Sequence, residues 1–432
     1  MEEPLPDLLA EPEIGGMFLV FTAGGIPLGS RSIATAELPI PGAALRELAL
    51  RTITPAVGDH LLEHGFRARL PLPRSAPPHD RPPSPGAVAA LQSPLDELRT
   101  RLREEASSGS PGPVSVIVCT RDRPDDLRRC LGALALLDPA PHEIVVVDNA
   151  PRSEAVRELV RATPGVRYVR EPRPGLSVAR NAGVRASTGG LIAFTDDDVI
   201  VDPTWLVGLR RGFRDPRVLA VTGLVLPAEL ETEAQFLFQH GDSGFGWGFR
   251  PLVYDREYFD RMRWRGVPVW HIGAGANMAF RREVFARVGL FDERLGAGAS
   301  GCSEDSEMWY RILAGGARCR YEPTAVVHHV HRRDMAGLED QMRQYMRGHV
   351  AALLIQWQRH RHPGNLVRAF GLLPAYYARR VLRRAALGTL GAEVAGSAAG
   401  IGFYLRHRHA PSVSPPPERA PLTSHPGNPA DA

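Results

Sequence analysis

The sequence predicts an α/β fold built on a doubly wound, mostly parallel sheet with helices on both faces. Two observations lead to this prediction. From residue 114 onward, short apolar strand-like runs alternate with amphipathic helical segments. The runs also end in polar residues, as strands do at the ligand-binding edge of such sheets. With 432 residues, 44% of them hydrophobic, the chain is long enough to bury a substantial core.

The first strand is predicted over VSVIVC at 114–119, because a nearly continuous apolar run is typical of a strand buried on both faces. The alternation then continues with a helix at 125–137, a strand at 143–148, a helix at 153–162, a strand at 166–170, a helix at 177–186 and a strand at 191–195. Parallel strands joined by helices place their carboxyl ends at one edge. The residues that follow these strands are therefore expected to converge on one crevice.

Composition divides the chain into five parts. In order, we expect a small β-containing module (1–70), a proline-rich linker with a short helix near 88–105 (71–112), the α/β domain (113–350), basic amphipathic helices (351–410) and a disordered tail (411–432). The helices suit peripheral contact with an anionic membrane through residues 359–408, and a helical hairpin packed on the domain is the alternative. A bilayer span at 385–404 is disfavoured because that stretch contains Glu393.

Charge and cysteine content narrow the functional class. All 52 basic residues are arginine and the net charge is +4, but the only basic concentration lies in the C-terminal helices, so nucleic-acid binding is not expected. The four cysteines lack metal-ligand or redox spacing, and the acidic N-terminus does not resemble a signal peptide. These features favour a cytoplasmic protein, at the inner face of the cell membrane if the basic helices bind it.

Three consecutive carboxylates, Asp196, Asp197 and Asp198, follow the strand at 191–195. Adjacent like charges repel, so the cluster needs a cation or hydrogen-bond donors to offset its cost. A divalent cation, Mn²⁺ or Mg²⁺, bridging a diphosphate would suit it, because hard cations take oxygen ligands and leave positions for phosphate oxygens. An acidic loop that caps the helix starting near Pro203 explains the cluster equally well.

Several motifs, taken in order, resemble those of family 2 glycosyltransferases of the GT-A fold over residues 113 to about 345. They are PVSVIVCTRDRPDDLRRCL, IVVVDNA, GLSVARNAGVRASTGGLIAFTDDDVIVDPTWL, GAGANMAFRREVFARVGLFDERLG and CSEDSEMWYRILAGG. The resemblance implies an inverting transfer of a sugar from a nucleotide diphosphate donor, with UDP- and dTDP-sugars favoured. The acceptor would be a hydroxyl on a glycan, a lipid-linked molecule or a small molecule, in cell-envelope or secondary-metabolite glycan biosynthesis.

The resemblance also implies roles for individual residues. Asp305 would be the general base that takes the proton of the acceptor hydroxyl, with Glu304 beside it. The nucleotide-sugar would be bound by Thr120, Asp122, Asp148, Arg180, Asp196 and Asp197, and the metal by Asp198, Asp196 and His329. Structural alternatives exist for two of these positions. Arg180 could tie a helix to the sheet through a salt bridge, and Ser303 with the acids after it makes a good helix start.

Histidines and aromatic residues supply further candidates. Among His328, His329 and His331, His329 matches best the late histidine that the family often places at the metal or diphosphate, and His331 shares its strand face if the strand continues. A zinc site is disfavoured, because no set of cysteines or carboxylates with zinc spacing accompanies them. The acceptor-side candidates are Asn277, Trp270 and Trp247, although the tryptophans would serve equally well to pack their loop onto the domain.

Two other classes of function remain open. A nucleotidyltransferase also uses acids at the edge of such a sheet, but no glycine-rich phosphate loop follows the first strand. A noncatalytic carbohydrate-binding protein on the same fold would be favoured if Asp305 lay far from the acidic cluster.

Overall fold

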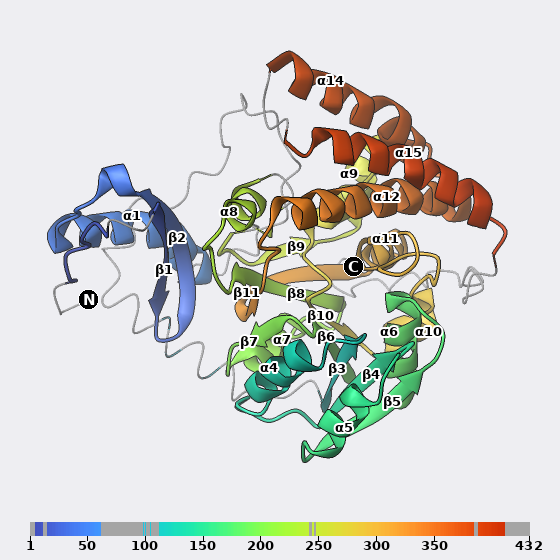
Figure 1. Cartoon of the computed structure of the whole chain (residues 1–432), viewed down its shortest axis with the longest axis horizontal. Coiled ribbons are helices and arrows are strands. Elements are labelled where there is room, and N and C mark those ends of the chain that lie inside the picture. The colour runs from blue at the N-terminus through green and yellow to red at the C-terminus, as the bar shows by residue number, and fades with distance from the viewer. Residues whose placement is uncertain are drawn as a thin grey trace, which may run out of the picture.

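A computed structural model of the chain describes residues 5–11, 15–61, 98, 100, 104, 112–241, 244–245, 248–383 and 388–410. Apart from a few single positions, the predicted linker with its short helix at 71–112 and the predicted tail at 411–432 lie outside these residues. Figure 1 shows a small N-terminal unit beside a large central sheet, with long C-terminal helices stacked along one side of the sheet.

A nine-stranded sheet forms the centre, in the order β5-β4-β3-β6-β10-β8-β11-β7, with β9 added on β11. Its strands are β3 (Val114–Thr120), β4 (Glu143–Asn149), β5 (Val166–Glu171), β6 (Leu191–Asp196), β7 (Val199–Val201), β8 (Val218–Pro227), β9 (Leu252–Tyr254), β10 (Asn277–Arg281) and β11 (Arg318–His329). The predicted strands β3, β4, β5 and β6 pair in parallel. The second half is mixed, because β10 runs antiparallel to β6 and β8.

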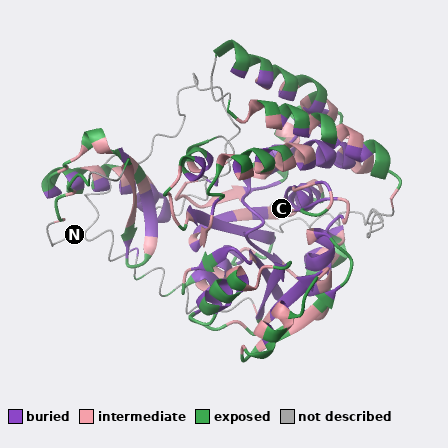
Figure 2. Ribbon diagram, viewed as in Figure 1, coloured by how far each residue is buried: buried purple, intermediate pink, exposed green. Residues whose placement is uncertain are grey.

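Helices cover both faces of the sheet, which confirms the predicted α/β class. They are α4 (Pro124–Leu134), α5 (Ala155–Arg161), α6 (Leu176–Ala186), α7 (Trp205–Gly212), α8 (Glu233–His240), α9 (Arg256–Met262), α10 (Glu283–Val288) and α11 (Glu304–Ala314), with short 3₁₀ turns η1 (Thr35–Glu37), η2 (Arg263–Arg265) and η3 (Val269–His271). Side chains alternate along β3, so Val116 and Val118 join one apolar cluster and Ile117 and Cys119 the other. Figure 2 shows the resulting burial of the sheet between its helices.

The expected N-terminal β-containing module is a hairpin of β1 (Gly16–Ala23) and β2 (Ile26–Ala34), followed by α1 (Gly42–Leu61). Phe18 and Val20 of the hairpin pack against β8 and β11 of the central sheet. Asp59 of α1 forms an ion pair with Arg250, and burial together with the charge of Arg211 lowers the pKa of the neighbouring His60 to about 4. The module is therefore docked on the sheet through both apolar and charged contacts.

The C-terminal part consists of α12 (Met335–His360), α13 (Gly364–Val367), the π-helix η4 (Arg368–Leu372), α14 (Leu373–Arg383) and α15 (Leu390–His407). The domain boundary predicted at 350 lies inside α12. Gly396 allows α15 to approach α12 closely, since an added Cβ would come within 2.3 Å of the Arg343 carbonyl oxygen. Glu393 is buried and accepts a hydrogen bond from Arg380 at 2.6 Å. None of the described helices has the length and apolar character that a bilayer crossing requires.

The contact between α7 and β11 gives a test of the packing. A Cβ on Gly208 would lie 2.4 Å from the Ala325 backbone nitrogen, so Gly208→Ala should lower the free energy of unfolding by about 1–3 kcal/mol. Gly132→Ala, in α4, is the matched control. Its Cβ would meet nothing within 4 Å, and it should raise the free energy of unfolding by about 0.5–1 kcal/mol. Urea unfolding measures both, and equal effects of the two variants would contradict the described packing.

Candidate active site

The carboxyl ends of β3, β4 and β6 lie together at one edge of the sheet, where the strand order predicts a ligand-binding crevice. The Thr120 hydroxyl, at the end of β3, donates a hydrogen bond to Asp197 Oδ2 at 2.7 Å. Asp122 lies close enough to Asp148, at the end of β4, for its charge to raise the pKa of that carboxyl further, beyond the larger effect of burial. The end of β11 reaches the same place, because the Val330 backbone nitrogen donates to the Asp198 carbonyl oxygen at 3.1 Å.

The three consecutive aspartates have different surroundings. The side chain of Asp196 is 31% exposed, against 6% for Asp197 and 8% for Asp198. Asp197 points inward, where Thr120 and Arg123 occupy its two carboxylate oxygens, and burial raises its pKa to about 7. This arrangement makes Asp197 an internal anchor for the turn after β6. Thr120 is also buried and donates its hydroxyl to Asp197. The predicted contact of these two residues with the nucleotide-sugar stays a prediction.

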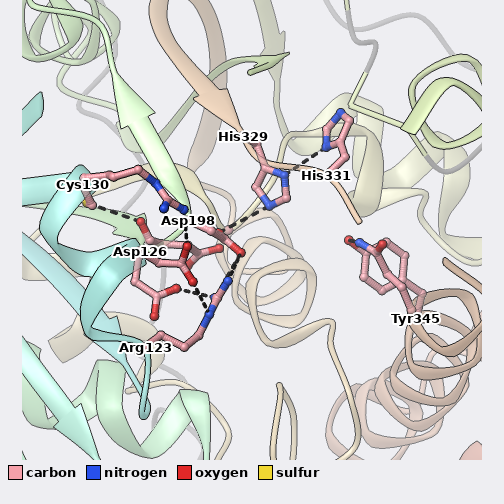
Figure 3. A network of polar contacts seen from close by, with 12 residues as sticks. Arg123, Asp126, Cys130, Asp198, His329, His331 and Tyr345 are labelled. Atoms are coloured by element: carbon pink, nitrogen blue, oxygen red, sulfur yellow. Dashed lines mark hydrogen bonds and ion pairs between the residues drawn. The ribbon is translucent and has the colours of Figure 1, made fainter. Parts of the chain in front are cut away.

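Arg123, at the start of α4, is a cation that forms ion pairs with the acidic cluster (Figure 3). Its guanidinium donates to Asp197 Oδ1 at 2.6 Å and, through both terminal nitrogens, to Asp198 Oδ2 at 3.1 and 3.2 Å. Its Nε lies 2.9 Å from Asp126 Oδ2. Burial alone would raise the pKa of Asp198, but His329 and Arg123 together lower it. Arg123 was not among the predicted site residues. Its position shortly after the first strand of the sheet, next to the strand that ends in the three acids, could have indicated it.

His329 closes the other side of the cluster. Its Nε2 lies 3.6 Å from Asp198 Oδ1, and its Nδ1 lies 3.0 Å from Nδ1 of His331. His331 is buried, hydrogen-bonds to Gln239 through Nε2 at 3.1 Å, and has its pKa lowered to about 3 by burial. His331 thus contacts the nitrogen of the His329 ring that does not face Asp198, as the dashed lines in Figure 3 show. His328 pairs with Ile200 on β7 and makes no such contact with the aspartates.

A buried arginine, Arg180 of α6, connects the acidic cluster to α11. It forms an ion pair with Glu304 through Nη1, and its Nη2 donates to Asp196 Oδ1 and to the Gly275 carbonyl oxygen, each at 3.3 Å. Phe194 and Phe291 flank it, each with its ring centroid 5.8 Å from the guanidinium carbon. The structure thus gives Arg180 the salt-bridge role that was one of its two interpretations. Its predicted contact with the nucleotide or diphosphate stays a prediction.

Asp305 lies on the first turn of α11, beside the same arginine. A Cβ on Gly275 would come within 2.9 Å of Arg180 Nη2 and 3.1 Å of Asp305 Oδ2, so only a glycine leaves these groups together. Burial raises the pKa of Asp305, and Arg180 and backbone hydrogen bonds from Ser306 and Gly275 oppose the increase. Asp305 and Asp196 therefore border one guanidinium. Asp305 thus does not lie far from the acidic cluster, as it would in the noncatalytic alternative.

The start of α11 differs from the prediction in one respect. Ser303 has a left-handed backbone, with φ 71°, and its side chain makes no capping hydrogen bond to the helix. The backbone nitrogen of Ser306 instead donates to Asp305 Oδ1 at 2.5 Å. The first turn is thus satisfied by the candidate base itself, which holds the carboxylate at the helix start.

Asp148 and Asp122 border the part of the crevice at the end of β4. The Tyr168 hydroxyl donates to Asp148 Oδ2 at 2.8 Å, while Asp148 Oδ1 is buried without a hydrogen-bond partner among the described residues. Asp122 has a left-handed backbone, with φ 55°, and accepts a hydrogen bond from the Arg152 backbone nitrogen at 2.9 Å. An unsatisfied buried acceptor is costly, so Asp148 Oδ1 suits a donor brought by a ligand.

The acceptor-side candidates fare differently. Asn277 is fully buried; its carboxamide accepts from Trp205 Nε1 at 2.8 Å and donates to the carbonyl oxygens of Leu224 and Ala325. This corrects its predicted role, because the amide is spent on tying the strands together inside the sheet. Trp270 lies under the Arg368 guanidinium at 3.9 Å, in a packing contact. Trp247 lies outside the described residues.

Tyr345 of α12 lies near the candidate site and was not among the predicted residues (Figure 3). Its hydroxyl accepts a hydrogen bond from Gln341 Nε2 at 3.0 Å. Burial raises the pKa of Tyr345, and the charges of Cys302, Asp305 and Asp196 add to the increase. Its ring packs against the apolar cluster that contains Phe238 and Met342. No local pattern marks it, because α12 reaches the crevice only through tertiary packing.

The described residues contain no cluster of three or more His, Cys, Asp or Glu side chains arranged to hold a metal. A cage made only of protein is not needed for Mg²⁺ or Mn²⁺ beside a diphosphate, since one or two carboxylates suffice when phosphate oxygens supply other ligands. Asp198, with His329 beside it, offers such a donor set. The residues therefore fit a substrate-assisted metal site.

Arg180 gives a test of how the site is held together. Arg180→Met should lower the free energy of unfolding by about 3–5 kcal/mol, because buried Glu304 loses its cation. Adding Glu304→Gln removes the uncompensated charge and should recover part of that loss. Urea unfolding at neutral pH measures the parent, the single variant and the double variant. No loss in the single variant would show that the pair does not link α6 to α11.

Comparison with known proteins agrees with this geometry. Residues 115–289 match the family model described as glycosyl transferase family 2. This stretch runs from β3 to the end of α10, and so contains Arg123, Arg180 and the three aspartates. Glu304, Asp305 and His329 lie beyond the matched residues.

Several curated relatives match over the same region. The pre-mycofactocin glycosyltransferase of Mycobacterium tuberculosis is 30% identical over 229 residues, covering 52% of this chain and 44% of that protein. A succinoglycan biosynthesis protein of Rhizobium meliloti is 28% identical over 226 residues, covering 50% of this chain and 66% of that protein. The validoxylamine A glucosyltransferase of Streptomyces hygroscopicus subsp. limoneus is 26% identical over 311 residues, covering 67% of this chain and 65% of that protein. The chain thus spans less than two thirds of the length of each.

Among solved structures, a mannosyltransferase of Pyrobaculum calidifontis in complex with GDP-Man and Mn²⁺ is similar with a TM-score of 0.45 and 18% identity, covering 70% of this chain and 93% of that one. The family match confirms the resemblance drawn from the motifs, and the observed sheet has the predicted α/β architecture. Residues 115–289 of the chain are therefore similar to glycosyl transferase family 2.

Proposed function

We propose that the protein is a glycosyltransferase that moves a sugar from a nucleotide diphosphate donor to a hydroxyl acceptor. The carrying observation is that Arg180 brings Asp196, at the end of β6, together with Glu304 and Asp305, at the start of α11, in one crevice of a family 2 domain. The names of the curated relatives, which include glycosyltransferases, support the same class.

The nucleoside of the donor is assigned to Asp148 and Asp122. Asp148 Oδ1 is buried and has no hydrogen-bond partner among the described residues, so it can accept a hydrogen bond from the N–H edge of a base. Uracil and thymine present one imide N–H of this kind, and guanine presents a ring N–H and an amino group. The preference for UDP- and dTDP-sugars therefore stays an expectation from the motif resemblance. The sugar and diphosphate would then extend toward Asp196, the most exposed of the three aspartates.

The divalent cation, Mn²⁺ or Mg²⁺, is assigned to Asp198, with one predicted neighbour, Asp196 or His329, and with phosphate oxygens as the further ligands. When bound, the cation would neutralise the charge of the departing diphosphate. Arg123 already places a positive charge on Asp198. Its guanidinium could therefore bind the diphosphate together with the cation. Alternatively, it could give up its hydrogen bonds to Asp198 Oδ2, so that this oxygen binds the cation.

Asp305 is assigned as the general base of an inverting transfer. The acceptor oxygen would form its bond to the anomeric carbon as the bond to the diphosphate breaks, and the hydroxyl proton would pass to the Asp305 carboxylate. A pKa raised by burial suits a base that works near neutral pH. Glu304, which is paired with Arg180, acts as a positioning residue rather than as a second base.

Variants of Asp305 and Asp198 are expected to affect different quantities, kcat in the first case and nucleotide binding in the second. Asp305→Asn should lower kcat by about 10²–10⁴-fold and leave the Kd for the nucleotide diphosphate unchanged, because only proton removal is lost. Asp198→Ala should weaken Mn²⁺-dependent binding of the nucleotide instead. Asp125→Asn, on the exposed side of α4, is the control for both and should behave as the parent. Equal loss of nucleotide binding in the two site variants would contradict the assigned roles.

The donor class is tested by calorimetric titration of the full chain with UDP, dTDP and GDP, each with Mn²⁺ and with excess EDTA. The proposal expects one uridine or thymidine nucleotide to bind, and EDTA to weaken that binding at least tenfold. Binding of GDP alone would keep the transferase and overturn the donor class. Binding of none, with or without metal, would overturn the enzyme assignment.

A further inference from the structure

The exposed side of the helical segment η4–α14 is almost entirely apolar. Its exposed residues are Val367, Phe370, Gly371, Pro374, Ala375, Ala378, Arg379, Val381, Leu382 and Arg383, which we call the α14 face. Exposure is 55% for Phe370 and 82% for Leu382. In a helix that only packs on a domain, the outward stripe is polar. Here two arginines are its only charged members.

The inward side of the same segment is already used. Leu373 and Tyr377 pack into an apolar cluster with residues of α12 and α15, and Arg380 is paired with Glu393. The segment therefore has two apolar sides, and only one is covered by described residues. A large exposed apolar surface of this kind marks an interaction site more often than a chance arrangement.

Trp264 lies beside the start of this segment. Gly364 of α13 packs against the backbone of η2, since an added Cβ would lie 2.6 Å from the Trp264 carbonyl carbon. The indole is 60% exposed, with the Arg263 guanidinium 5.2 Å from its ring centroid. A half-exposed tryptophan next to arginine is typical of side chains at a membrane–water interface.

The charged residues of the α14 face itself are both arginines, whereas Asp260 lies 3.8 Å from Arg263 beside Trp264. Arg379 and Arg383 belong to the face, and the sequence from 361 to 383 contains no Asp or Glu. The acid nearest in the C-terminal helices, Glu393, is buried in its ion pair with Arg380. A second copy of the same face would bring no acid to pair with these arginines. An anionic surface complements them, and arginine stems can lie along apolar chains while their heads reach phosphates.

We propose that the α14 face, with Trp264, docks the protein on an anionic lipid bilayer, with the helix lying in the headgroup layer. This narrows the predicted contact at 359–408 to one helical side. The docking does not depend on the transferase chemistry, but it rests on the proposed function for its use, because it would hold the crevice near a membrane-bound hydroxyl acceptor. The burial and charge of the face, and not the length of the helix, carry this assignment.

The test is flotation of the full chain with vesicles of phosphatidylcholine alone and of phosphatidylcholine mixed with phosphatidylglycerol. We expect binding to the mixed vesicles only, weakened by added salt. Phe370→Ser with Leu382→Ser should reduce binding at least tenfold, and Arg379→Gln with Arg383→Gln should remove the preference for anionic vesicles. Leu136→Ser, which changes an equally exposed leucine that follows α4, should bind as the parent.

Three results would overturn the proposal: no binding of the parent to either vesicle, binding unchanged in both double variants, or binding that appears only after residues 411–432 are removed. A dimer of the parent that Leu382→Ser converts to a monomer, without vesicle binding, would assign the face to a second copy and also overturn it. Nucleotide titration of the same variants keeps the two proposals apart. Lost flotation with unchanged nucleotide binding leaves the transferase assignment intact, and the reverse result leaves the docking intact.

Discussion

The arrangement of the crevice depends on one buried ion network, centred on the Arg180 guanidinium. A cation buried this deeply is stable only when carboxylates and hydrogen-bond acceptors surround it, and Arg180 meets Glu304, Asp196 and the Gly275 carbonyl. These partners belong to α11, to the end of β6 and to the segment before β10. Satisfying one charge therefore fixes three elements relative to each other, and Asp305 is carried into place with α11.

The C-terminal helices support the same arrangement from outside. Glu307 of α11 accepts a hydrogen bond from Arg311 at 2.8 Å, and Arg359 of α12 lies 3.4 Å from its other oxygen. Arg359 also lies 3.5 Å from Asp292 Oδ2, which Arg294 contacts at 2.6 Å. The helix that carries the candidate base is thus held to α12 by buried charges. This contact makes the first part of the C-terminal helices a continuation of the domain.

The acidic cluster is stable because its three charges are offset in three ways. Asp197 is buried, where it pairs with Arg123 and accepts a hydrogen bond from Thr120. Asp198 contacts both Arg123 and His329. Asp196 pairs with Arg180, and part of its side chain stays exposed. Consecutive like charges are tolerated because each finds a different partner. The sequence predicts a cation site at this cluster, and the cations that the described residues place beside it are Arg123 and Arg180.

The sequence by itself determined the parallel half of the sheet and its helices, because β3, β4 and β6 are buried on both faces and need long apolar runs. It also located the acidic cluster and the start of α11, since both are marked by adjacent residues.

Only the tertiary structure decided three points. Asp196 is the most exposed of the three aspartates, Arg123 pairs with the other two, and Asn277 belongs to the core. Arg123 is 74 residues from Asp197, and Arg180 is 124 residues from Glu304. Periodicity and spacing describe neighbours along the chain, whereas these charges find their partners through packing between distant elements.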